Sequence, residues 1–178
     1  MEEKSALVVG DGPTGLSAAL FLAKNGFTVD VIGDGGTAVR KAMLHNYLGL
    51  DVEGPKLLEK GRAQAAAHGA RFHEGIVEHV EVGEAFGASV GGKTLRARFL
   101  VLATGWSGVP DGLDLEKAEH GVHADRDGRT SMERVYAGGA LVRGKKSQVA
   151  TSVGDGASIA VDLLSHVAGK PTHDYDTL

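Results

Sequence analysis

A glycine-rich turn, Gly10-Asp11-Gly12-Pro13-Thr14-Gly15, is the feature of this sequence that most directly predicts chemistry. An apolar strand precedes it, and apolar residues at helical spacing follow it. In such a unit Gly10 permits the tight turn, Gly12 lets main-chain N–H groups approach a phosphate, and Gly15 lets helix and strand pack closely. The helix N-terminus adds partial positive charge. The turn therefore predicts a site for a nucleotide pyrophosphate; the alternative is an α/β turn without a ligand.

An acidic residue is expected just after the second strand, where it accepts hydrogen bonds from the hydroxyls of an adenosine ribose. Residues 27–32 have the pattern of that strand. Gly33 then stands at the usual acidic position, so Asp34 serves only with a shift of one residue. The alternative is that Asp34 merely helps to form the turn at residues 33–36.

Composition limits both the architecture and the partners of the chain. With 178 residues, of which 42% are hydrophobic, it fits one domain with a substantial core. A formal charge of −4, without a long run of either sign, gives no electrostatic signal for nucleic acid or an anionic membrane. The N-terminus lacks an apolar targeting segment and no apolar run is long enough to span a bilayer, so we expect a cytoplasmic location.

The absence of cysteine from the sequence narrows the chemistry further. It excludes disulfides, thiolate metal ligands, iron–sulfur ligation and C-x-x-C redox pairs within this chain. Among the histidines only His120 and His123, with Asp125, are close enough to suggest a metal site, and their polar loop favours a solvated role. We therefore predict no metal and no catalytic side chain.

The elements that position these residues follow from hydrophobic periodicity and turn residues. The order of elements favours an α/β fold, and the apolar run 99–103 is expected to return to a parallel sheet that is covered on both faces. We predict helices at Pro55–Gly69 and around 157–167, and strands at 70–74, 76–82, 86–90, 94–103 and 135–137.

The domain organisation follows from the same pattern. Residues 109–132 are polar and read as a loop with at most one short strand, and the tail after Pro171 reads as loosely held. We predict a single domain over residues 1–178, with core halves at 1–108 and 133–170 that are joined by the short connection 109–132.

Four separated motifs resemble the FAD domain of thioredoxin reductase-like flavoproteins, the class II type of pyridine nucleotide-disulfide oxidoreductases. They occur in the order of that family and cover nearly the whole chain. The resemblance implies a three-layer FAD/NAD(P)-binding, Rossmann-like fold with a central parallel sheet and a smaller antiparallel β-meander. The motifs are the turn at 10–15, His45-Asn46-Tyr47-Leu48-Gly49, Ala103-Thr104-Gly105, and Tyr136-Ala137-Gly138-Gly139 followed by Ser147-Gln148-Val149-Ala150-Thr151-Ser152.

The resemblance implies FAD as the cofactor and assigns its contacts position by position. Residues 10–15 would hold the diphosphate, while Thr104 and Gly105 would run beside the FAD. Asn46 would contact the flavin end, and Val77 would meet the adenine through its backbone. The alternatives are an Asx turn at Asn46 and a strand core position for Val77.

The resemblance also places the start of the final helix at the flavin. Gln148, Val149 and Ala150 match the segment whose backbone meets the isoalloxazine edge, and the helix N-terminus would favour negative charge on the reduced flavin. Without the resemblance, these residues read as an ordinary lead-in to a helix.

Departures from the family pattern are as informative as the matches. Gly139-Ala140 replaces a Gly-Asp pair whose aspartate binds the ribityl chain, a loss of about 1.5 to 3 kcal/mol in binding. Only about thirty residues separate Gly105 from Tyr136, too few for the NADPH domain that relatives insert there. The redox dithiol of the relatives is absent as well.

We therefore expect an FAD-binding flavoprotein oxidoreductase that is not a thioredoxin reductase by itself. It would take electrons from a separate reductase or free NAD(P)H and pass them to oxygen, a quinone-like molecule or a redox partner protein. The alternative is a non-catalytic module for FAD or an adenine nucleotide, or a subunit of a split reductase. By analogy with the relatives, a homodimer is expected.

Overall fold

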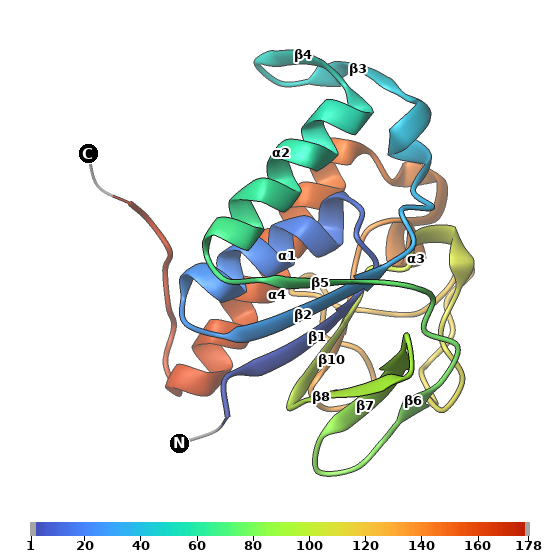
Figure 1. The fold of residues 1–178 in the computed structure, drawn as a ribbon, viewed down its shortest axis with the longest axis vertical. Helices are drawn as coiled ribbons and strands as arrows, with labels where there is room; N and C mark the ends of the chain where they lie inside the picture. Colours follow the sequence, from blue (N-terminus) through green and yellow to red (C-terminus); the bar gives the residue numbers. More distant parts are fainter. Residues whose placement is uncertain (1–2, 177–178) are drawn as a thin grey trace.

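The computed structural model describes residues 3–176 and has a five-stranded parallel sheet at its centre, in the order β10-β9-β1-β2-β5 (Figure 1). The central strand β1 pairs with β2 on one side and with β9 on the other. The sheet is therefore extended first on the β2 side and later in the chain on the β9 side, and the order of strands reverses at β1. Such a switch point opens a crevice at the carboxyl ends of the strands. The strands are β1 (Ser5–Val9), β2 (Thr28–Gly33), β5 (Arg71–Glu74), β9 (Phe99–Leu102) and β10 (Val135–Ala137).

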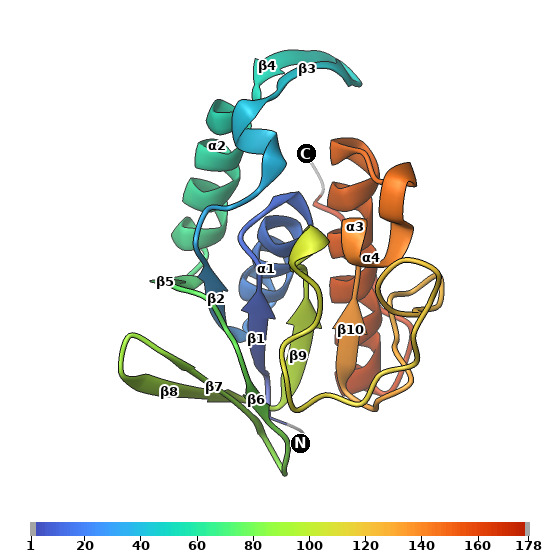
Figure 2. The ribbon, with the colours of Figure 1, turned by 90° about the vertical axis from the view of Figure 1, so that its right-hand side faces the viewer.

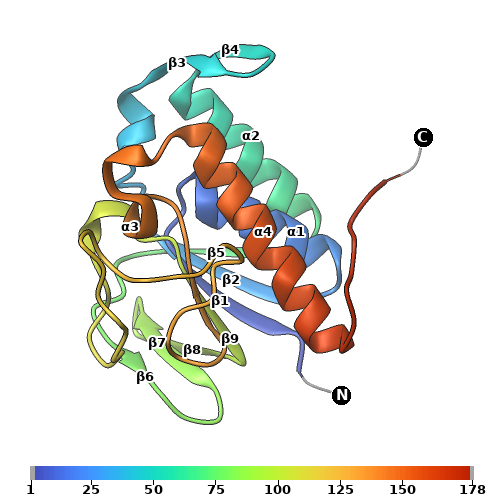
Figure 3. The same cartoon turned by 180° about the vertical axis from the view of Figure 1, so that it is seen from behind.

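Three helices cover one face of this sheet, as Figures 1 and 3 show: α1 (Pro13–Lys24), α2 (Gly54–Ala67) and α4 (Val149–Ala168). Alternate residues of β1, Ala6 and Val8, pack into a core beneath them. Helices α1 and α4 approach closely because Gly156 has no side chain; a Cβ there would collide with the Thr14 carbonyl oxygen.

A small antiparallel sheet lies over the opposite face (Figure 1). The other residues of β1, Leu7 and Val9, join a second core with Phe86 of this sheet. The three layers confirm the predicted fold class. The antiparallel strands are β6 (Val80–Glu81), β7 (Phe86–Val90) and β8 (Lys93–Ala97).

Two predicted strands are shorter in the structure. The expected strand 94–103 divides at Arg98, whose N–H donates to Ser5 Oγ over 2.9 Å where the chain passes from the antiparallel to the parallel sheet. The expected strand 76–82 is reduced to β6, because only Val80 and Glu81 have ladder partners on β7. The preceding residues 76–79 lie along a cleft at the sheet edge instead.

Several short elements escaped prediction. A hairpin of β3 (Met43–Tyr47) and β4 (Leu50–Glu53) projects beyond the sheet, as Figure 2 shows. The connection 109–132 is irregular, as predicted, apart from isolated bridges. The remaining short elements are η1 (Ala38–Lys41), η2 (Gly105–Ser107), α3 (Ala140–Arg143) and η3 (Gly144–Lys146).

The tail after Pro171 is tied down more than the sequence indicated. Lys24 Nζ of α1 lies 2.8 Å from Asp174 Oδ1 and 2.7 Å from Asp176 Oδ2, and Thr172 N–H donates to Ser165 Oγ of α4. Across residues 3–176, the structure shows no helix long and apolar enough to cross a membrane.

Candidate cofactor-binding site

The glycine turn lies at the switch point of the sheet, between β1 and α1. Gly10 has φ of +113°, and a Cβ there would collide with the Ala103 carbonyl oxygen of the neighbouring strand end. A Cβ at Gly15 would collide with the Gly10 carbonyl oxygen. Both positions therefore require glycine for close backbone packing, the role that the sequence pattern predicts.

The N-terminus of α1 faces this turn without a capping side chain. Gly12 is the N-cap residue, and among residues 3–176 the structure shows no side-chain cap on this helix. Pro13 occupies the first turn, where a missing N–H costs nothing. A Cβ at Gly12 would meet Thr37 Oγ1 at 3.4 Å, so the space beside the turn is already narrow. This combination of free amides and positive helix end suits a diphosphate.

A cleft of about 490 Å³ extends from the turn along the carboxyl ends of β1 and β2. It gathers four of the predicted contact residues, Gly10, Asp34, Val77 and Thr104. Val77 is buried in the loop after β5 rather than in a strand. Thr104 Oγ1 donates to the Gly108 carbonyl over 2.5 Å, which fixes the loop that follows β9.

Two predicted flavin-end residues also meet in the structure. Asn46 of β3 donates from Nδ2 to Gln148 Oε1 over 3.1 Å. Gln148 is the N-cap of α4, and its own N–H donates to Thr151 Oγ1. The projecting hairpin is thereby linked to the start of the final helix, with Val149 and Ala150 in the first helical turn.

The Gly139-Ala140 segment packs on the same helices. Gly139 has φ of +68°, and a Cβ there would collide with Thr14 Oγ1 of α1. Its N–H donates to Asp155 Oδ2 of α4 over 2.9 Å. Arg143 pairs with the same carboxylate, and this ion pair raises the pKa of the Arg143 guanidinium. Asp155 therefore serves to hold this loop on α4, and it is already neutralised by an arginine.

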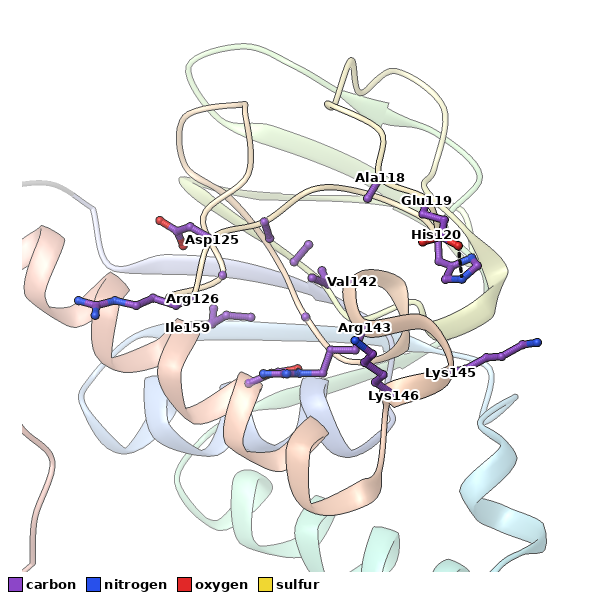
Figure 4. Close-up of a pocket in the computed structure, with 15 residues that line it drawn as sticks. Ala118, Glu119, His120, Asp125, Arg126, Val142, Arg143, Lys145, Lys146 and Ile159 are labelled. Atoms are coloured by element: carbon purple, nitrogen blue, oxygen red, sulfur yellow. Dashed lines mark hydrogen bonds and ion pairs between the residues drawn. The ribbon is translucent and has the colours of Figure 1, made fainter.

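A larger cavity, of about 700 Å³, lies between α4 and the connection 109–132 (Figure 4). It is lined by charged residues, but Arg126 and Lys145 extend away from each other at its two ends. Arg143, which also lines it, is paired with Asp155. None of the main-chain amides of the glycine turn reaches this cavity, so we do not assign it to the cofactor.

Sequence reasoning missed Asp11 and Arg62 at the site. Asp11 lies inside the glycine turn, and its carboxylate occupies space above Gly33 at the end of β2. Arg62 Nη1 of α2 is 4.0 Å from Asp11 Oδ2. The signal in the sequence that could have identified Asp11 is an acidic residue inside the turn combined with glycine, Gly33, at the position where an acidic residue is expected. Within residues 3–176, no group of three histidine or acidic side chains is arranged to hold a metal ion.

The doubly covered sheet and the glycine turn at its switch point define an FAD/NAD(P)-binding oxidoreductase fold. Residues 4–112 match the family model described as pyridine nucleotide-disulphide oxidoreductase, and the chain belongs to this family. Within it, the chain is a thioredoxin reductase-like FAD domain without a C-x-x-C motif.

Individual relatives agree with this assignment. The chain is 34% identical over 115 residues to a thioredoxin reductase of Rickettsia bellii, covering 58% of this chain and 37% of that protein. It is 26% identical over 193 residues to an alkyl hydroperoxide reductase subunit of Pseudomonas putida, covering 99% of this chain and 34% of that protein. The chain thus spans little more than a third of these relatives.

A solved structure confirms the fold over the whole chain. A thioredoxin reductase from Gloeobacter violaceus superposes with a TM-score of 0.87 at 15% identity, and the match covers 100% of both chains. At this low identity the likeness establishes the fold and leaves the chemistry to the residues of the site.

Proposed function

We propose that the chain binds FAD, extended along the carboxyl edge of the parallel sheet. The observation that carries this proposal is the convergence of segments far apart in the sequence. The glycine turn after β1 and the loop after β9 line one cleft, and the N-terminal part of α4 packs beside α1, with Ser17 Oγ 2.8 Å from the Val153 carbonyl oxygen. Gly10, Gly15 and Gly139 are among the glycines at which a Cβ would collide with neighbouring groups, which is consistent with a closely packed cradle.

Each part of the cofactor has candidate contacts. Main-chain amides of the turn would hold the diphosphate, and the cleft beyond it would take the adenosine. The proposed contact residues are Gly10, Gly12, Pro13, Thr14 and Gly15 at the diphosphate, Val77 at the adenosine, Thr104 and Gly105 alongside, Gly139 and Ala140 at the ribityl chain, and Asn46, Gln148, Val149 and Ala150 at the flavin. Asp34, expected from the sequence at the adenosine ribose, lines the same cleft but is engaged in its own turn.

We propose an oxidoreductase activity with an external electron donor, either a separate reductase or free NAD(P)H. FAD, when bound, supplies reversible electron transfer, while the protein orients it and tunes it electrostatically. The α4 N-terminus, capped by Gln148, would stabilise negative charge placed beside it. Because this chain has no cysteine, electrons would leave the site without a dithiol of this chain.

A second candidate function is a non-catalytic module that binds FAD or an adenine nucleotide. Ala140 favours it, because the methyl side chain replaces the carboxylate that relatives use at this position. A subunit of a split reductase is a related form of this candidate. A cytoplasmic location and a homodimer remain predictions, the latter testable by sedimentation equilibrium.

The test is a visible spectrum of the purified protein, with the released cofactor identified, followed by anaerobic titration with NADPH. Bound FAD that bleaches supports the oxidoreductase. Bound FAD that resists NADPH and a reductase-coupled donor supports the module. A colourless protein that FAD does not stabilise against heat overturns both. Gly12→Asp tests whether FAD binding depends on the glycine turn. The variant places a carboxylate where the diphosphate is proposed to bind, so it should abolish FAD binding.

A further inference from the structure

Two departures of this sequence from the nucleotide-binding pattern occupy one place in the structure. Gly33 ends β2, where the pattern expects an acidic residue. A Cβ built on Gly33 would lie 2.5 Å from Asp11 Cγ and 2.6 Å from Asp11 Oδ1. The carboxylate of Asp11 therefore fills the space into which a side chain at residue 33 would extend.

We propose that Asp11, rather than Asp34, is the acidic group that accepts hydrogen bonds from the adenosine ribose hydroxyls. This inference rests on the proposed binding of FAD. The parallel register pairs Val9 with Ile32, so the residues that follow these two strands lie side by side. Gly10 and Gly33 both line the adenosine cleft. In this chain the acidic side chain therefore comes from the turn after β1, and it lies where a side chain at the end of β2 would begin.

The surroundings of Asp11 hold its carboxylate in this position. Its side chain is only 12% exposed, and its Oδ2 lies 4.0 Å from Arg62 Nη1. The Arg62 guanidinium in turn stacks over the Phe72 ring, 4.1 Å from the ring centroid. Arg62 therefore supplies a positioned positive charge, which offsets the repulsion between Asp11 and a neighbouring diphosphate.

Asp34 has a different role in the structure. Its Oδ1 accepts the Gly36 N–H over 2.8 Å, an Asx turn in an exposed loop. A carboxylate that is engaged in shaping its own turn and open to water is a weak candidate for ligand recognition. Its presence in the cleft follows from the path of the loop after β2.

The inference is tested by measuring calorimetric dissociation constants for FAD, ADP and 2′,3′-dideoxy-ADP with wild type, Asp11→Asn and Asp34→Asn. We expect Asp11→Asn to weaken FAD binding about 10- to 100-fold, the loss typical of a charge-assisted hydrogen bond. The wild type should prefer ADP over dideoxy-ADP, and Asp11→Asn should lose that preference. Asp34→Asn should bind all three ligands within about twofold of wild type.

Other outcomes overturn the inference in distinguishable ways. Equal weakening of ADP and dideoxy-ADP by Asp11→Asn would show a structural role only, and tighter binding would show that Asp11 repels the diphosphate. Loss of the ribose preference in Asp34→Asn would assign the contact to that residue. Failure of the wild type to bind FAD or ADP would overturn the proposed function itself.

A double variant guards against a folding defect in Asp11→Asn. Asp11→Gly with Gly33→Glu returns the acidic group to the end of β2 and removes the collision at residue 33. We expect it to retain the preference for ADP over dideoxy-ADP, whereas Asp11→Gly alone should lose it. If the double variant does not prefer ADP over dideoxy-ADP, the proposal that Asp11 takes the role of an acidic residue at the end of β2 is wrong.

Discussion

At the scale of single residues, Gly10 shows most clearly how backbone packing dictates the sequence of the site. Gly10→Ala would place a Cβ against the Ala103 carbonyl at φ of +113°. Gly26→Ala is the matched control, because φ there is +82° and nothing lies within 4 Å of its Cβ. We expect about 1 kcal/mol of destabilisation at Gly26 and at least about 2 kcal/mol more at Gly10. Urea unfolding measures both; equal losses would refute the close approach.

Ala140 offers the opposite kind of test, a gain of binding. Ala140→Asp introduces, at the first residue of α3, the aspartate that the family resemblance leads us to expect after Gly139. We expect FAD to bind about 10- to 100-fold more tightly, as measured by flavin fluorescence titration. Ala140→Asn controls for side-chain size. An unchanged affinity for FAD in both variants would show that residue 140 does not contact the ribityl chain.

At the scale of elements, β10 is joined to α4 through a buried phenol. Tyr136 is 4% exposed, and its hydroxyl donates to Asp162 Oδ2 over 3.2 Å. Burial, and then the Asp162 charge, raise the pKa of Tyr136 above its ordinary value of about 10. Above that pH the unfolded chain releases a proton that the folded chain retains, so unfolding becomes easier as pH rises.

We therefore expect the free energy of unfolding to fall with a slope of up to about 1.4 kcal/mol per pH unit between about pH 10 and 11 from this group alone. In Tyr136→Phe, this fall in the free energy of unfolding between about pH 10 and 11 should be absent. At about pH 8 the variant should be less stable than the wild type, because it lacks the hydrogen bond to Asp162. Urea unfolding at the three pH values measures the difference. Parallel pH profiles for the two proteins would show that Tyr136 titrates normally.

Some of the helices and strands can be predicted well from local sequence patterns. The glycine turn, α1 and α2 follow from local signals, because their periodicity and their glycine and proline positions act within one segment. The division of strand 94–103 at Arg98 does not, since it depends on a bond to Ser5, far away in sequence. The β3–β4 hairpin was missed because its strands alternate weakly and project from the core.

The residues of the site also differ in how far they can be predicted from sequence. Gly10, Gly12 and Gly15 are predictable because their roles are conformational, whereas the position of Asp11 over Gly33 depends on two strands lying side by side. A pattern that allows any residue between Gly10 and Gly12 carries no information about the side chain there.

At the scale of the whole molecule, ligand binding and folding are linked. If FAD binds only the folded chain, a concentration of about 100 times Kd stabilises it by about 2.7 kcal/mol. We expect the melting temperature of wild type to rise with FAD concentration, and that of Gly12→Asp to stay constant. Differential scanning calorimetry checks both; an equal rise in the two proteins would place binding away from the turn.

The most direct measurement for the central claim is a crystal structure of this chain with FAD. We predict diphosphate oxygens within hydrogen-bond distance of main-chain amides in the turn 10–15, with the adenosine in the cleft beside Gly33 and Val77. FAD bound instead in the cavity beside the connection 109–132, or a turn that stays empty at saturating FAD, would contradict the account.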